Sequence, residues 1–140
     1  MEAAYKLLGK WPVSREELDK NKKMIRITPK DWLHVIHGQE NHILISFFVS
    51  NDLINVGQIV IPPAKASDME EHKGDEGLYV LSGKLMVRIF EDDDDLSSVS
   101  NSSFEVLEGQ KFLIPEGYKH QYLNCTDRLV KVLFMVAPEL

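Results

Sequence analysis

Short runs of β-branched and aromatic residues, each bounded by turn-forming residues, fill the sequence from residue 24 onward. These runs are residues 24–27, 43–49, 56–61, 78–81, 85–90, 104–107, 112–114 and 129–136. Clusters such as Ser50-Asn51-Asp52 and Pro115-Glu116-Gly117 separate the runs and favour tight turns. Each run suits one strand and is too short for a helix that packs in a core. The pattern therefore predicts an all-β fold, either a sandwich or a barrel.

The first 23 residues follow a different pattern. Ser14 and Glu17 have the spacing of a helix capping box, with Ser14 as the N-cap residue and Glu17 reaching back to it. Lysines follow where the negative end of the helix dipole would lie. We expect an N-terminal segment over residues 1–23 with a short helix at about 15–23, and a single domain over residues 24–140.

The charge balance argues against nucleic acids and membranes as partners. The chain has 16 Lys and Arg against 22 Asp and Glu, and five of the acidic residues form the run 91–95. Without that run the formal charge rises from −6 to −1, and no basic stripe suited to a phosphate backbone remains. No apolar run reaches the ~18 residues of a membrane helix. The acidic, Ser-rich stretch 91–103 is expected to be a solvated hairpin loop.

The cysteine content bears on the compartment. Cys125 is the single cysteine, so no intrachain disulfide can form, and the N-terminus lacks the long apolar stretch of a signal peptide. These features predict a reducing compartment, and we expect a cytoplasmic protein.

Four side chains of the metal-binding type lie at spacings that suit one site. Glu70, His72 and Glu76 are separated by even numbers of residues, so in an extended chain they point to the same side. His120 begins a later stretch whose even-numbered residues also share one face. Imidazole nitrogen and carboxylate oxygen are donors that zinc and first-row transition metals accept, provided that a rigid scaffold brings them together.

Two segments resemble the two sequence motifs of the cupin superfamily. The first is Glu70-x-His72-x3-Glu76-x6-Gly83, and the second is Gly109-x5-Pro115-x-Gly117-x2-His120-x3-Asn124. The second motif matches at every fixed position, whereas the first has Glu70 where the family usually has a His. The resemblance implies a double-stranded β-helix, or jelly-roll barrel, beside the short N-terminal helix.

The resemblance also implies which residues hold a metal ion. The ligand positions of the family map onto Glu70, His72, Glu76 and His120. The set of His72, Glu76 and His120 is also the arrangement found in non-heme iron(II) oxygenases. Glu70 is either a fourth ligand or a general base that stands beside the metal. The expected cofactor is a divalent metal ion, namely Mn, Fe, Zn, Co or Ni.

The other polar residues near these motifs have simpler interpretations. Tyr122 shares the parity of His120, and it either donates a proton or hydrogen bond to a substrate or lines the barrel as an ordinary aromatic residue. His34, His37 and His42 are interpreted as polar residues without a role at the metal.

Family resemblance brings in sugar isomerases and epimerases, lyases and dioxygenases. We expect a metal-dependent enzyme that acts on a small polar molecule, similar to a sugar or a hydroxy acid, by isomerase, epimerase or lyase chemistry. Glu70 and Tyr122 are the expected catalytic residues. The alternatives are a non-catalytic barrel that binds a small molecule and a non-heme iron dioxygenase. The resemblance also implies a homodimer.

Overall fold

The computed structural model describes residues 2–92 and 99–138. Its helices are α1 (Glu2–Tyr5), α2 (Arg15–Asn21) and the 3-10 helix η1 (Pro29–Asp31). Its strands are β1 (Leu33–His37), β2 (Ile43–Ser50), β3 (Asn55–Ile61), β4 (Asp75–Ser82), β5 (Lys84–Asp92), β6 (Val99–Leu107), β7 (Lys111–Ile114), β8 (Lys119–Leu123) and β9 (Val130–Ala137). The predicted all-β fold is confirmed.

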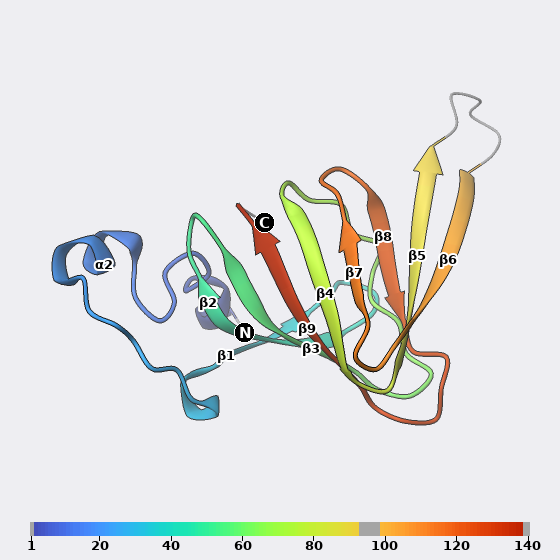
Figure 1. The fold of residues 1–140 in the computed structure, drawn as a ribbon, viewed down its shortest axis with the longest axis horizontal. Helices are drawn as coiled ribbons and strands as arrows, with labels where there is room; N and C mark the ends of the chain where they lie inside the picture. The colour runs from blue at the N-terminus through green and yellow to red at the C-terminus, as the bar shows by residue number, and fades with distance from the viewer. Residues whose placement is uncertain (1, 93–98, 139–140) are drawn as a thin grey trace.

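The strands of the described residues form two antiparallel sheets (Figure 1). The larger has the order β1-β2-β3-β9-β4-β7 and the smaller β6-β5-β8. Because β9 lies between β3 and β4, and β8 pairs with β5, strands that are distant in the sequence become neighbours. The irregular segment between β3 and β4, residues 62–74, is joined to β8 by isolated bridges at Ala66 and Glu70. These bridges place residues 62–74 beside β8, although the two segments are about 50 residues apart in the sequence.

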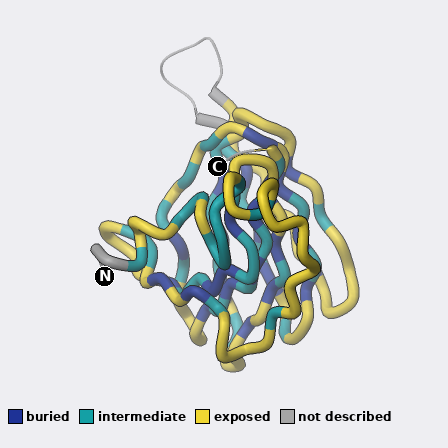
Figure 2. Tube along the Cα trace, turned by 90° about the vertical axis from the view of Figure 1, so that its left-hand side faces the viewer, coloured by how far each residue is buried: buried dark blue, intermediate teal, exposed yellow. Residues whose placement is uncertain are grey.

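Alternating burial along the strands builds one core between the sheets. In β3, every second residue from Asn55 to Ile61 is buried, as happens when one face of a strand packs against a core. Ile59 and Val132 of the larger sheet meet Val87 of the smaller one in the same cluster. Figure 2 shows the buried positions, in dark blue, running through the middle of the molecule. Each fully buried side chain of this kind contributes about 1.5–3 kcal/mol.

The strand prediction was wrong at two places near the N-terminus. Residues 24–27 belong to no strand, and Met24 is fully exposed. β1 was not predicted, because His34 and His37 interrupt a run of only five residues. Its pairing with β2, with Val35 opposite Ile45, gives β1 a buried face that residues 24–27 do not have.

The prediction of a loop over residues 91–103 was also wrong at both ends. β5 continues to Asp92, and β6 begins at Val99, with Phe90 opposite Asn101 in the ladder. Backbone pairing between antiparallel strands does not require apolar side chains, so a polar, Ser-rich sequence extends the hairpin. Residues 93–98 lie outside the described residues.

The N-terminal segment is attached to the barrel at several points. α2 begins at the expected cap, where Glu17 N donates to Ser14 Oγ at 3.2 Å. The preceding helix α1 was not predicted; it packs beside β1, and the Tyr5 hydroxyl donates to the Ile36 carbonyl at 3.1 Å. Trp11 exchanges two backbone hydrogen bonds with Ser50, at 3.0 and 2.9 Å.

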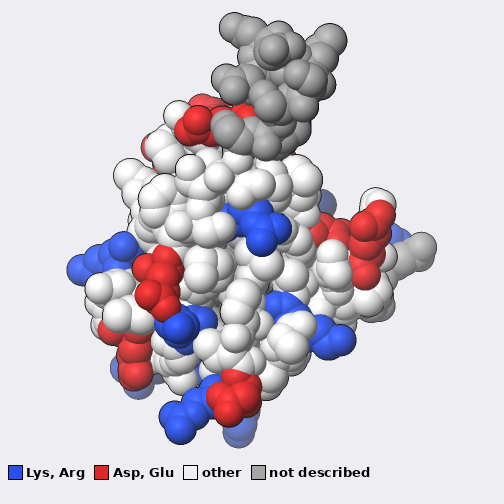
Figure 3. All heavy atoms as spheres, turned by 90° about the vertical axis from the view of Figure 1, so that its right-hand side faces the viewer, with Lys and Arg blue, Asp and Glu red and all other residues white. Residues whose placement is uncertain are grey.

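Charged side chains of both signs lie at the surface of the molecule. On the face that Figure 3 shows, basic and acidic side chains are interspersed. No helix within the described residues has the length and apolar character needed to span a bilayer.

Candidate metal centre

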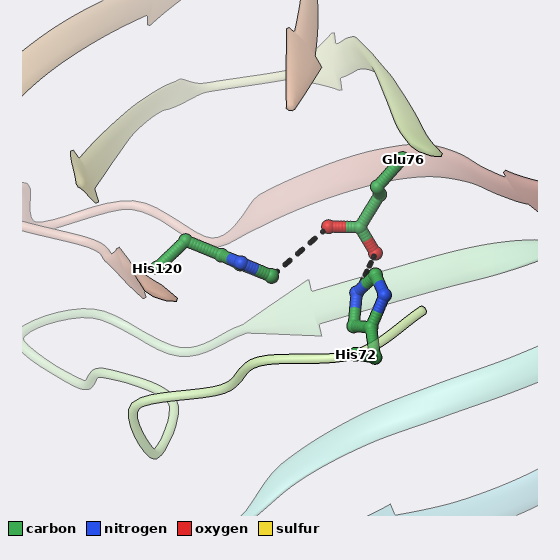
Figure 4. Close-up of side chains that lie close together, drawn as sticks. All are labelled: His72, Glu76 and His120. Atoms are coloured by element: carbon green, nitrogen blue, oxygen red, sulfur yellow. Dashed lines mark ion pairs between the residues drawn. The ribbon is translucent and has the colours of Figure 1, made fainter. Parts of the chain in front are cut away.

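Three side chains from different elements converge between the two sheets (Figure 4). His72 comes from the irregular segment before β4, Glu76 from β4 and His120 from β8. One ligand atom of each lies within 4.8 Å of the others. Glu76 is only 5% exposed and His120 only 1% exposed. The structure therefore brings together three of the four residues that the motifs predict as ligands.

The local structure fixes the positions of these residues. Glu76 lies on the inward face of β4, opposite Ile114 of β7 and Val136 of β9. Two backbone hydrogen bonds between Glu70 and His120, both 2.8 Å long, hold the segment before β4 against β8. Gly74 then turns the chain with φ of 86°, which favours glycine because it has no Cβ. This turn sends His72 and Glu76 into the same space.

Backbone carbonyls orient both imidazole rings. Nδ1 of His72 donates to the Lys73 carbonyl at 3.0 Å, and Nδ1 of His120 donates to the Tyr118 carbonyl at 2.9 Å. A ring that donates through Nδ1 presents the lone pair of Nε2, as metal-binding histidines do. In both residues Nε2 is buried and has no hydrogen-bond partner. The two unpaired nitrogen atoms face the same carboxylate.

The arrangement of charges fits a cation. His72 Nε2 lies 3.7 Å from Glu76 Oε1, and His120 Nε2 lies 3.3 Å from Glu76 Oε2. Glu76 Oε2 is itself buried without a hydrogen-bond partner. Buried lone pairs and a buried carboxylate that face one another need a positive charge between them. Two imidazoles and one carboxylate suit Zn²⁺ and the first-row transition metals from Mn²⁺ to Ni²⁺.

The pKa values of His72, His120 and Glu76 shift in the directions that favour protonated imidazoles beside an ionised carboxylate. The polar contact with Glu76 raises the pKa of His72 above its ordinary value, although burial opposes this. Burial lowers the pKa of His120, but the interactions with Glu76 outweigh it and the net shift is upward. Burial raises the pKa of Glu76, and contacts with His120 and His72 reverse the effect, so its pKa falls below the ordinary value.

Glu70 does not join these three residues. Its carboxylate is hydrogen-bonded to Nε2 of His37, at the end of β1. That contact raises the pKa of His37. Nδ1 of the same ring lies 3.5 Å from the Tyr5 hydroxyl. Glu70 and His37 thus form a second pair of polar side chains beside the metal centre, and the role of Glu70 as a ligand stays a prediction.

His37 is the site residue that sequence reasoning missed. It was interpreted as a polar residue without a role, like His34, whose ring is satisfied by Ser46 Oγ at 2.7 Å. The spacing of these histidines does not distinguish them. Only the pairing of β1 with β2, at the register that places His37 opposite Ile43, brings its ring to the site.

Tyr122 lies next to the centre on β8. Its ring is 5.3 Å from that of His120, and its hydroxyl is buried without a hydrogen-bond partner. A buried tyrosine hydroxyl usually finds a partner, so this one is free to bind a ligand. Asn124, which shares its parity, is instead fully engaged with the Ile61 and Arg128 carbonyls and has a structural role.

A cavity of about 740 Å³ adjoins the centre, with His72, Glu76 and Tyr122 in its lining. His37 and Glu70 also line it, as do the exposed residues Tyr5 and Met69. This volume lies within the range of small-molecule sites, about 300–1,000 Å³.

The fold is a small β-barrel in which three side chains of the metal-ligand type converge. The family model described as "Cupin domain" matches residues 57–136, and the chain belongs to this family. The predicted jelly-roll barrel is confirmed.

Solved structures with the same fold have diverse origins. A cupin superfamily protein from Desulfitobacterium hafniense is 16% identical, with a TM-score of 0.57 over 74% of this chain and 84% of that one. An oxalate oxidase is 18% identical, with a TM-score of 0.60 over 71% of this chain and 53% of that one. The cupin domain of Drosophila melanogaster CENP-C is 16% identical, with a TM-score of 0.62 over 80% of this chain and 79% of that one. No curated protein matches the sequence.

Proposed function

We propose that the protein binds a divalent metal ion through His72, Glu76 and His120 and acts on a small molecule in the adjoining cavity by isomerase, epimerase or lyase chemistry. The observation that supports this proposal is the pair of buried, unpartnered Nε2 atoms that face the Glu76 carboxylate. A bound divalent ion supplies Lewis acidity, which polarises a carbonyl or hydroxyl oxygen. The substrate is expected to present oxygen atoms to this end of the cavity.

The residues beside the centre are suited to move protons. Glu70 is the proposed general base, and the hydrogen bond from His37 orients its carboxylate toward the cavity that both residues line. Tyr122 is the proposed acid, because its buried hydroxyl has no hydrogen-bond partner among the described residues. A redox-neutral proton transfer requires an acid and a base that both reach the ligand.

A dioxygenase is the second candidate, and the donor set favours it. Two histidines and one carboxylate leave positions open at an iron ion. The two candidates differ in their need for oxygen, since isomerase and lyase chemistry runs without O₂. A non-catalytic binding barrel is the remaining alternative, in which a metal ion anchors a ligand and no turnover follows.

The metal content of the purified protein tests the proposal. We expect about one divalent ion per chain, lost in His120→Ala and retained in His42→Ala, because His42 is exposed and outside the cluster. Elemental analysis after exhaustive dialysis measures this directly. Protein without metal after reconstitution, or unchanged binding in His120→Ala, would contradict the proposal. The cytoplasmic location remains a prediction from the single cysteine.

A further inference from the structure

Part of the cavity wall is made of hydrocarbon side chains. Val35, Ile45 and Ile59 lie side by side across β1, β2 and β3, since Val35 pairs with Ile45 and Ile45 with Ile59. All three line the cavity. The larger sheet therefore presents a continuous aliphatic row to the ligand.

Two aromatic rings extend this wall. Phe47 and Phe134 also line the cavity, and their rings meet edge to face with centroids 5.6 Å apart. Gly57 lies between them in the sheet, opposite Phe47 on one side and Phe134 on the other. A Cβ at residue 57 would stand 2.9 Å from the Phe134 ring, so the glycine allows the two rings to approach.

Polar side chains line the rest of the cavity. They include the candidate metal ligands His72 and Glu76, the Tyr122 hydroxyl and the pair of His37 and Glu70, together with Gln39 and Glu71. Asp68, which also lines the cavity, is already engaged with the backbone N–H groups of Gln39 and Asn41, at 2.6 and 2.7 Å. The aliphatic row and the two aromatic rings therefore offer a ligand no polar side chain, and its polar partners must come from the other lining residues.

We propose that the cavity binds a 2-hydroxy or 2-oxo carboxylic acid whose side chain is a hydrocarbon lying against the wall of β1, β2, β3 and β9. This inference rests on the proposed function, because the acid end is assigned to the metal. A divalent ion with the single carboxylate of Glu76 keeps one positive charge, which complements a monoanion. A carboxylate and a neighbouring oxygen are hard donors that can bind one such ion together.

The same wall argues against a sugar as the ligand. A sugar carries a hydroxyl on nearly every carbon, and each one buried against Val35, Ile59 or Phe134 would lose its hydrogen bonds to water. A hydrocarbon chain in that position gains instead, by ~0.8 kcal/mol for each buried methylene, or about fourfold in affinity. The apolar wall thus selects between two ligands that present the same head group.

Calorimetric titration of the Co²⁺-loaded protein tests this inference with matched ligands. Gluconate and 2-hydroxyhexanoate share the head group and the number of carbons and differ in the hydroxyl groups of the tail. We expect 2-hydroxyhexanoate to bind at least tenfold more tightly, and affinity to rise about fourfold per methylene from 2-hydroxybutanoate to 2-hydroxyhexanoate. A change in the visible Co²⁺ spectrum on binding will report that the acid reaches the metal.

Two variants on one strand provide the matched control. Ile45→Gln places a polar group in the wall and should remove most of the gain from the longer tail, whereas Leu44→Gln, on the opposite face of β2, should leave it unchanged. If the protein binds no Co²⁺, the proposed function and this inference both fail. If it binds Co²⁺ but prefers gluconate, or shows no dependence on tail length, only this inference is overturned.

Discussion

Gly57 lies on β3 and Gly77 on β4, and only Gly77 has room for a methyl group. A Cβ at residue 57 would stand 2.2 Å from the Ser46 carbonyl oxygen, while at residue 77 no heavy atom lies within 4 Å. We expect Gly57→Ala to lower the free energy of unfolding by about 1–3 kcal/mol, because backbone on β2 has to move. Urea unfolding will measure it, with Gly77→Ala as the control.

The control variant separates steric conflict from the general effect of replacing glycine. Gly77→Ala should change stability by less than about 1 kcal/mol, since the added methyl group meets open space and restricts the unfolded chain. Equal destabilisation by both variants would show that the close approach of Gly57 to Ser46 and Phe134 has no energetic weight.

If His72 and His120 bind the proposed metal ion, pH should affect the stability of the metal-free protein and the contribution of metal binding in opposite directions. Contacts with Glu76 raise the pKa of both His72 and His120 in the folded state. A raised pKa stabilises the fold fully below the unfolded value of about 6.5, and this stability is lost as the pH rises through the folded pKa. Metal binding instead needs the neutral rings, so its contribution grows over the same range.

Thermal unfolding between pH 6 and pH 8 checks this prediction. In the presence of a chelator, the melting temperature should fall as the pH rises. The increase in melting temperature on adding metal should become larger over the same pH range. The raised pKa of His37 acts in both forms, so the difference between the two curves isolates the centre. Glu76→Gln should flatten the metal-free curve. Parallel curves with and without metal would contradict the assignment of His72 and His120 as ligands.

At the scale of single residues, the cluster of His72, Glu76 and His120 could be predicted from the resemblance to the two cupin motifs. The expectation from strand parity does not hold for His72, which lies before β4 and meets Glu76 because the chain turns at Gly74. Glu70 has the same parity, but the bond to His37 holds its carboxylate outside the cluster, and that partner lies on a strand far earlier in the chain. Pairing across such a distance is set by the sheet register and not by any local pattern.

At the scale of elements, the irregular segment before β4 depends on one carboxylate for its attachment to the β1–β2 loop. Asp68 accepts hydrogen bonds from the backbone N–H groups of Gln39, Glu40 and Asn41, and these bonds lower its pKa. We expect Asp68→Asn to speed amide hydrogen exchange at residues 39–41, because an amide oxygen accepts more weakly than a carboxylate. Mass spectrometry of peptides that cover the loop will measure this.

Asp52→Asn, in the exposed turn between β2 and β3, is the matched control and should leave exchange at residues 39–41 unchanged. The metal content should stay the same in both variants, since neither residue belongs to the cluster. Unchanged amide exchange at residues 39–41 in Asp68→Asn would contradict this prediction, because other contacts of the loop would then be enough to protect these amides.

The elements that the sequence predicted well are those with a buried face. β2, β3 and β9 carry long alternating or continuous apolar runs, so their existence follows from composition alone. β1 and the polar part of β6 are strands because a partner pairs with them, and residues 24–27 are not a strand because none does. Whether a partner strand is available is a tertiary property, which explains why the sequence did not predict these three strand assignments.

At the scale of the whole molecule, the crossed order of the strands builds the site from both halves of the sequence. β4 contributes Glu76 from the larger sheet, and β8 contributes His120 from the smaller one. The same order leaves β7 at the edge of the larger sheet. Next to it, on the outer face, an apolar groove of about 500 Å³ is lined by Tyr79, Leu113 and Met135 among others.

The expected homodimer can be tested at this groove. Leu113 is 66% exposed and Met135 is 47% exposed, and a second copy of the chain would remove both from water. We expect the wild-type protein to elute as a dimer and Leu113→Glu as a monomer, because a buried charge without a partner disfavours the interface. Light scattering coupled to size-exclusion chromatography measures the mass. Leu53→Glu, at an exposed residue that is not part of the groove lining, should remain dimeric. A monomeric wild-type protein would refute the dimer, and a dimeric Leu113→Glu would place its interface elsewhere on the barrel.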